Sequence, residues 1–152
     1  MHLSSSAFED GGTIPERYTR MGENKFPPLK WSSFPAETKG FALLVEDPDA
    51  PKQTFRHCLL VNIPENCDHL DDKSLDRVAE VGAFALNDFG NAGYDGPEPP
   101  REHGPHRYHF RLAALQVPNI KVDKDADATT VWAQVCVNAV EMASLTGTYE
   151  RH

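Results

Sequence analysis

Acidic and imidazole side chains stand where apolar segments of this chain begin and end. Asp47 and Asp49 follow one apolar run, and His57 directly precedes the next. His106 opens a later segment in which apolar and polar residues alternate. A carboxylate that binds one imidazole nitrogen fixes the tautomer, which leaves the other nitrogen for an anion. These residue types therefore predict a small anion-binding pocket.

The segments that must position these residues read as strands. Residues 40–46 and 58–63 are near-continuous apolar runs, typical of strands that are buried on both faces. Residues 107–116 alternate, as in a half-buried strand. Asp47 leaves its strand, whereas the two histidines enter theirs. If both later strands pair antiparallel with the first, all three side chains gather at one end of the sheet.

Alternation along an extended chain also predicts which face each side chain occupies, because residues two apart point the same way. Asp47 precedes a proline, which favours an extended backbone, so we expect its carboxylate to face the same side as that of Asp49. The same rule places Asp47 with Leu43 and Val45, His57 with Leu59 and Val61, and His106 with Tyr108 and Phe110.

Residues 87–105 are predicted to form the opposite wall of the pocket. They contain four glycines and four prolines, which no helix or central strand tolerates. Loops of this length in compact domains are often functional. Gly96 can bring a backbone N–H close to an anion, and Pro97 stiffens the wall beside it. Tyr108 would add a hydroxyl or an aromatic side.

Composition limits the classes of function. With 152 residues, 39% hydrophobic and 25% charged, the chain is expected to form a single soluble domain, residues 1–152. The net charge of −8 argues against a nucleic-acid partner. No apolar run approaches the length of a membrane span, and no signal peptide is recognisable. Three cysteines without a CxxC pair favour a reducing, cytoplasmic location.

The remaining segments complete the expected fold. Residues 129–142 predict a helix that Asp127 or Thr129 caps, and residues 144–149 predict a last short strand. Residues 64–80 are expected to form a polar surface excursion with one helical turn. In the helix expected at 129–142, the apolar residues that recur at helical spacing and should face the core are Val131, Trp132, Val135, Cys136, Ala139 and Val140. These features predict a mainly β fold, an antiparallel β-sandwich of two sheets with Greek-key-like connections and one or two peripheral helices.

Five pieces of the sequence, in order, resemble the phosphatidylethanolamine-binding protein family, also called Raf-kinase-inhibitor-like proteins, and above all its short bacterial and archaeal branch. They are PPLKW at 27–31, FALLVEDPDAP at 41–51, HCLLVNIP at 57–64, NDFGNAGYDGPEPP at 87–100 and HRYHF at 106–110. The resemblance implies a β-sandwich with one anion pocket. Carried over position by position, that pocket comprises Asp47, Asp49, Pro51, His57, Gly96, Pro97, His106 and Tyr108.

The resemblance also implies ligands and partners. Phosphate, acetate, phosphoethanolamine head groups of phospholipids and phosphorylated side chains are the ligands of such pockets. A kinase or protease as protein partner and a homodimer are further implications. Arg56 and Cys58 flank His57 where family members often have aromatic residues, so we expect a less aromatic rim.

Three functions stay open, of which a non-enzymatic binding protein without a cofactor is preferred. A protein-interaction regulator that inhibits a kinase or protease is the second. An Asp/His hydrolase is the third, although no GxSxG elbow is present. A metal site at His103, His106 and His109 is not favoured, because spacings of three do not keep side chains on one strand face. The triplet Asp88-Phe89-Gly90 is interpreted as a turn.

Overall fold

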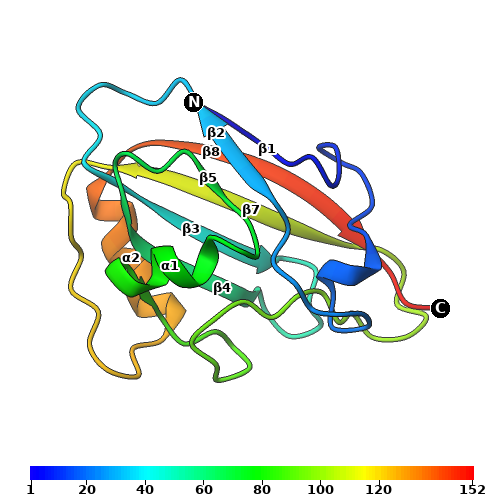
Figure 1. Ribbon diagram of the computed structural model, residues 1–152. Coiled ribbons are helices and arrows are strands. Elements are labelled where there is room, and N and C mark those ends of the chain that lie inside the picture. Colours follow the sequence, from blue (N-terminus) through cyan, green and yellow to red (C-terminus); the bar gives the residue numbers. More distant parts are fainter.

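The computed structural model describes all 152 residues, which form two antiparallel sheets, two α-helices and one 3₁₀ helix (Figure 1). The smaller sheet has the strand order β1-β2-β5 and the larger sheet the order β6-β4-β3-β7-β8. The strands are β1 (His2–Ser4), β2 (Leu29–Ser32), β3 (Gly40–Asp47), β4 (Phe55–Pro64), β5 (His69–Leu70), β6 (Ala83–Phe84), β7 (His106–Leu115) and β8 (Ala139–Tyr149). The helices are η1 (Glu16–Tyr18), α1 (Leu75–Val81) and α2 (Ala128–Asn138). The predicted mainly β, two-sheet architecture is confirmed.

Strand β3 is buried along its whole length because its two faces pack against different cores. Leu43 and Val45 belong to the core between the two sheets, whereas Ala42 and Leu44 belong to the core under α2. The smaller sheet contributes Leu3, Leu29, Trp31 and Leu70 to the first core. Each fully buried leucine stabilises the fold by roughly 1.5–3 kcal/mol. The near-continuous apolar run of β3 therefore reflects a central strand with no solvent-facing side.

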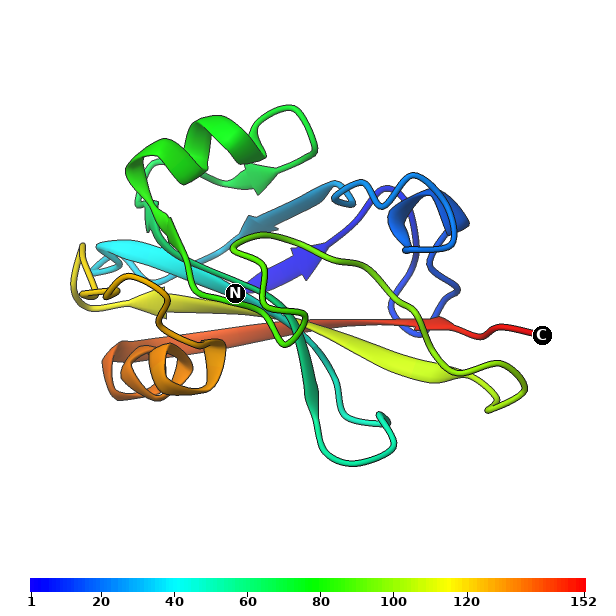
Figure 2. The same ribbon diagram turned by 90° about the horizontal axis from the view of Figure 1, so that it is seen from below.

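Helix α2 covers the face of the larger sheet that lies away from the smaller sheet (Figure 2). Its first turn is capped as predicted, since the Asp127 carboxylate accepts a hydrogen bond of 2.7 Å from the backbone N–H of Thr130. Val131 and Val135 lie one turn apart and pack into the core beneath the helix. Cys136, which the helical spacing placed in the core, is exposed instead. Neither α1 nor α2 is long and apolar enough to cross a membrane.

The predicted helix over residues 129–142 is too long. α2 ends at Asn138, and β8 begins at the next residue and runs to Tyr149. Residues 139–142 pair with β7 in the register Leu115↔Ala139, Ala114↔Glu141 and Ala113↔Met142. Backbone pairing along the whole of β7 therefore overrides the local helical periodicity, which carries no information about a partner strand.

The polar residues 64–80 contain more regular structure than the one expected turn. β5 at His69–Leu70 completes the smaller sheet, and α1 follows at Leu75–Val81. Ser74 and Asp71 bond reciprocally before α1: the Ser74 hydroxyl accepts from the Asp71 N–H, and the Asp71 carboxylate accepts from the Ser74 N–H. Residues 87–105 contain no helix and no strand, as predicted.

One glycine tests how tightly β8 is packed. Gly147 pairs with Tyr108, and an added Cβ would overlap the side chain of buried Ile14. We expect Gly147→Ala to lower the free energy of unfolding by about 1–3 kcal/mol, because overpacking a filled core displaces its neighbours. Urea denaturation measures the change. Gly93→Ala is the matched control, since a Cβ there meets open space, and an equal loss in both variants would contradict the prediction.

Candidate functional site

Three buried polar side chains meet at one end of the larger sheet. β3 pairs antiparallel with both β4 and β7, so the end of β3 lies beside the starts of its two neighbours. Asp47, His57 and His106 stand at these ends, and each is at most 4% exposed. The gathering expected from the exit and entry points of the strands is confirmed. Buried polar groups need partners, so the contacts of each group define what remains for a ligand.

His57 reaches this end of the sheet through a β-bulge. The register between β3 and β4 steps from the pair Val45↔Cys58 to the pair Glu46↔Arg56, which leaves His57 as the additional residue. Simple alternation placed His57 with Leu59 and Val61, and that expectation is wrong. Those two residues pack toward α2, whereas His57 contacts the opposite face. The bulge turns the imidazole to the side of Asp47.

Asp47 and His106 form the central contact of the site. The Asp47 Oδ2 atom lies 2.6 Å from His106 Nδ1, and both side chains are at most 5% exposed. The second oxygen, Oδ1, accepts a hydrogen bond of 2.8 Å from the backbone N–H of Asp49. His106 Nε2 in turn lies 2.6 Å from His103 Nδ1. Because the Asp47 carboxylate only accepts, Nδ1 of His106 carries a proton, and Nε2 of the neutral ring accepts from His103. This nitrogen is therefore not left for an anion, contrary to expectation.

His57 is held by the backbone of the opposite wall. Its Nδ1 atom lies 2.7 Å from the carbonyl oxygen of Asp95. A carbonyl only accepts, so Nδ1 carries the proton and Nε2 is the ring nitrogen available to a ligand. Burial lowers the pKa of His57, and the hydrogen bond to Asp95 and the charge of Asp47 oppose that shift. A neutral imidazole is therefore the resting form near pH 7.

Tyr108 presents the one buried side-chain atom of the site that has no partner. The residue is fully buried, and its hydroxyl makes no hydrogen bond. Its ring meets that of His57 edge-on at 5.4 Å between centroids. Burial, followed by the charges of Asp47 and Asp49 and by the closeness of the Asp47 carboxylate to the hydroxyl, raises the pKa of Tyr108 above its ordinary value. The phenol therefore keeps its proton and offers a donor.

These groups surround a cavity of about 150 Å³. It is lined by Asp47, Ala50, Pro51, Phe55, His57, Phe89, Glu98, Pro99, Pro100, His106 and Tyr108. Phe55 and Phe89 pack edge-on at 4.7 Å, and the Phe55 ring lies 5.0 Å from that of His57. The rim thus contains two aromatic rings, although the immediate neighbours of His57, Arg56 and Cys58, are not aromatic. Phe89 comes from the triplet that the sequence assigned to a turn.

Asp47, Pro51, His57, His106 and Tyr108 thus line one cavity, and three other predicted residues do not. Asp49 holds Arg107: its carboxylate accepts from the Arg107 backbone N–H at 2.8 Å and from the guanidinium at 2.9 and 3.0 Å. These bonds lower the pKa of Asp49 to about 2. The carboxylates of Asp47 and Asp49 therefore have separate partners and do not act as one pair.

Gly96 and Pro97 lie behind the cavity wall. The N–H of Gly96 donates to the side-chain oxygen of Asn24 at 2.7 Å and is therefore not directed at a ligand, contrary to expectation. A Cβ at this position would collide with the carbonyl oxygen of Tyr18, which explains the glycine. The carbonyl of Pro97 accepts from the N–H of Arg20 at 3.0 Å. Both residues fasten the wall to the N-terminal loop.

Asp95 is a positioning residue that the sequence did not reveal. Its carboxylate accepts hydrogen bonds from the side-chain amides of Asn24, Asn87 and Asn91 at 2.9 to 3.1 Å. Burial opposes ionisation, but these bonds and the nearby Arg20 hold the pKa of Asp95 below its ordinary value. The network fixes the carbonyl that binds His57. In the sequence, the regular spacing of four residues between Asn87, Asn91 and Asp95 could have indicated this network.

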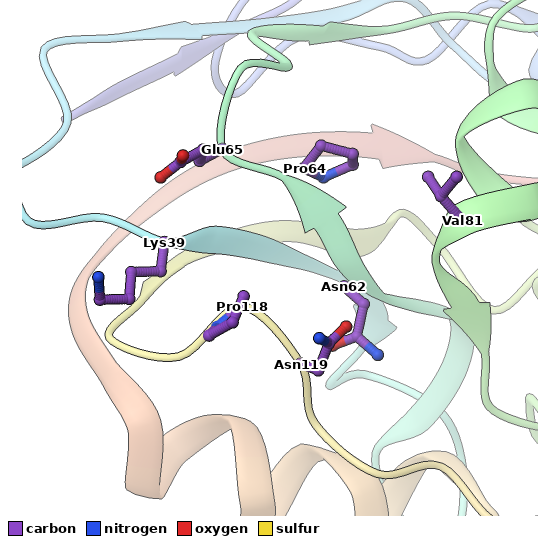
Figure 3. Close-up of a pocket in the computed structure, with 7 residues that line it drawn as sticks. All are labelled: Lys39, Asn62, Pro64, Glu65, Val81, Pro118 and Asn119. Carbon is purple, nitrogen blue, oxygen red and sulfur yellow. The ribbon is translucent and has the colours of Figure 1, made fainter.

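A second hollow is larger but has no such groups. It measures about 410 Å³, and Figure 3 shows that its lining side chains are spread widely. They are Lys39, Asn62, Pro64, Glu65, Val81, Pro118 and Asn119. Both amide atoms of Asn62 are already bonded to the backbone of Ile120. No buried polar side-chain atom in this hollow lacks a hydrogen-bond partner, so we place the candidate site at the smaller cavity beside Tyr108. No group of three or more His, Cys, Asp or Glu residues is arranged to hold a metal ion.

Comparison with known proteins yields one consistent family. The model of the phosphatidylethanolamine-binding protein family matches residues 4–150. A UPF0098 protein of Methanothermobacter thermautotrophicus is 39% identical over 153 residues, 99% of each chain. The crystal structure of E. coli YbcL, described as a member of the mammalian PEBP family, has a TM-score of 0.92 at 31% identity, covering 99% of this chain and 98% of YbcL. Carboxypeptidase Y inhibitor has a TM-score of 0.59 at 23% identity, covering 99% of this chain and 83% of the inhibitor.

The different surroundings of the two aspartates lead to a stability prediction. We expect Asp47→Ala to cost about 3 kcal/mol of unfolding free energy, because it leaves the buried His106 without its partner. Asp49→Ala should cost much less, since its pair with Arg107 is exposed to solvent. Urea denaturation of both variants at neutral pH measures the difference. Equal losses would contradict the separate roles of these two carboxylates.

Proposed function

Because the chain belongs to the phosphatidylethanolamine-binding protein family, we propose that it is a binding protein whose cavity between Asp47, His57, His106 and Tyr108 holds a small anion of the phosphate or phosphate-ester type. The observation that carries the proposal is the buried Tyr108 hydroxyl, which makes no hydrogen bond and has the Asp47 carboxylate as its nearby acceptor among the cavity residues. An unpaired buried donor costs roughly 1–3 kcal/mol, and an anion oxygen would satisfy it.

The donor set determines the form of the anion. Tyr108 donates from its hydroxyl, and His57 donates from Nε2 only when it is protonated. A ligand that carries its own proton can instead donate to Nε2 of the neutral ring. The lining contains no Lys or Arg and includes the carboxylates of Asp47 and Glu98. These charges favour a singly charged, protonated anion over a fully ionised one.

The size of the cavity limits how much of a ligand it holds. Pockets for drug-sized molecules measure roughly 300–1,000 Å³, and this cavity of about 150 Å³ is smaller. Only a head group such as phosphate or a carboxylate therefore fits, with the rest of the ligand outside. Pro51, Phe55 and Ala50 also line an adjoining hollow of about 480 Å³, where that remainder can lie.

The alternatives have less support. The cavity lining contains no Ser, Thr, Cys or Lys, so a hydrolase here would depend on a carboxylate, an imidazole or Tyr108, and the carboxylate of Asp47 is already bonded to His106. An inhibitor of a kinase or protease would use the surface around the cavity. Carboxypeptidase Y inhibitor, at 23% identity, shares the fold alone with this chain. We therefore treat a protein partner as a hypothesis, which binding that survives His57→Ala would favour.

Removal of the Tyr108 hydroxyl tests the proposed site. We expect Tyr108→Phe to weaken phosphate binding about tenfold, because a hydrogen bond to a charged group contributes roughly 1.5 kcal/mol. NMR titration with inorganic phosphate gives the affinity from shifts at His57 and His106. Tyr149→Phe is the matched control, since that hydroxyl contacts Glu16 away from the cavity. Unchanged affinity in Tyr108→Phe, or an absence of shifts at both histidines, would refute the proposal.

The pKa of His57 predicts how binding depends on pH. Burial holds this pKa below 6.5 in the free protein, and a bound anion favours the protonated ring. Affinity should therefore rise as pH falls from about 8 toward 5.5, and level off below the pKa of the free protein. Sulfate is the probe, because it stays ionised over this range and its own titration does not contribute. A pH-independent sulfate affinity measured by calorimetry would exclude His57 as a donor.

A further inference from the structure

We infer that Arg20 decides which anions the cavity accepts, because its guanidinium fills a cation subsite on the cavity wall. On this inference, which rests on the proposed function, a phosphate ester without a cation binds better than a zwitterion such as phosphoethanolamine. Arg20 stands in none of the sequence segments that resemble the family, and it lies outside the cavity lining itself.

Two residues of the cavity lining hold the Arg20 side chain. Its guanidinium carbon lies 4.0 Å from the centre of the Phe89 ring, within the range of a cation–π contact. Its Nε atom lies 3.7 Å from the Glu98 carboxylate. Phe89 and Glu98 both line the cavity, on the wall formed by residues 87–105. The guanidinium therefore lies directly against the cavity wall.

The backbone fixes Arg20 in this position. Its N–H donates to the carbonyl of Pro97, and the adjacent Thr19 packs so closely on Gly96 that a Cβ there would touch it. The Thr19 hydroxyl, fully buried, donates to the carbonyl of Glu16 at 2.8 Å and closes the turn that precedes Arg20. The side chain thus starts from a rigid anchor on the cavity wall.

This arrangement has a consequence for ligand choice. An ammonium group binds well between an aromatic face and a carboxylate. Arg20 already occupies such a place, between Phe89 and Glu98. A zwitterionic ligand must displace the guanidinium to use this place; otherwise its ammonium lies in the adjoining hollow, where Asp88 is the one carboxylate and Lys52 repels a cation. A ligand without a cation keeps the Arg20 contacts intact and gains the attraction of a positive charge nearby. In a lining without Lys or Arg, that charge also offsets the carboxylate of Glu98.

The test compares two ligands that differ only in the ammonium group, ethyl phosphate and phosphoethanolamine. In the unmodified protein we expect ethyl phosphate to bind more tightly. Arg20→Ala should weaken ethyl phosphate about fivefold and leave phosphoethanolamine equal or tighter, so the affinity ratio falls at least that much. Arg20→Lys keeps the charge and should retain most of the preference. NMR titration followed at His57 gives each affinity.

The matched control is Arg17→Ala. This change removes the same charge three residues earlier, in η1, but the Arg17 guanidinium lies 5.4 Å over the Tyr18 ring, and neither residue lines the cavity. We expect its affinity ratio to equal that of the unmodified protein. Thermal unfolding of each variant verifies that it is folded. If Arg20→Ala is not, Arg20→Gln removes the charge instead, and the same fall in the affinity ratio is expected.

The outcomes separate this inference from the proposed function. If both ligands bind, and His57→Ala abolishes the shifts that they cause at His106, but the ratio is the same with and without Arg20, the inference is overturned and the proposed function stands. Tighter phosphoethanolamine binding in the unmodified protein also overturns it. If neither ligand shifts the signals of His57 in any variant, the proposed function fails and the inference with it.

Discussion

The buried hydrogen bond between Asp47 and His106 joins the end of β3 to the start of β7, and the site depends on it. A carboxylate withdrawn from water is stable only when both oxygens have partners. His106 satisfies one oxygen, and the N–H of Asp49 satisfies the other. The same bond sets which nitrogen of His106 faces His103. Sheet pairing and the protonation pattern of the cavity are therefore parts of one arrangement.

Much of this arrangement follows from the sequence. The apolar run of β3 and the alternation of β7 give the strands, and antiparallel pairing then brings Asp47 and His106 together. Such inferences succeed because they use backbone periodicity, which is local, and one assumption about strand direction. The motifs shared with the family added the wall of residues 87–105, whose lack of helix and strand the composition already required.

The expectations that were wrong concern partners distant in sequence. The N–H of Gly96 donates to the side chain of Asn24, which lies 72 positions away in the sequence. No residue near Gly96 in the sequence indicates that bond. Residues 139–142 have a helical pattern but follow β7, because a long ladder outweighs one turn of helix. The position of His57 depends on a bulge whose existence is decided by the pairing of two strands together. Local pattern cannot supply any of these contacts.

The bulge at His57 makes the cavity depend on the number of residues in β4 as well as on their identities. If β4 were one residue shorter at this point, Glu46 would face His57 in ordinary register, and the imidazole would turn toward α2. The sheet would lose no strand, because the pairs from Leu43↔Leu60 to Val45↔Cys58 would stay in place. The loss of one residue from β4 would therefore remove the cavity and keep the fold. The histidine alone is therefore not sufficient for the site, which also needs the additional residue that forms the bulge.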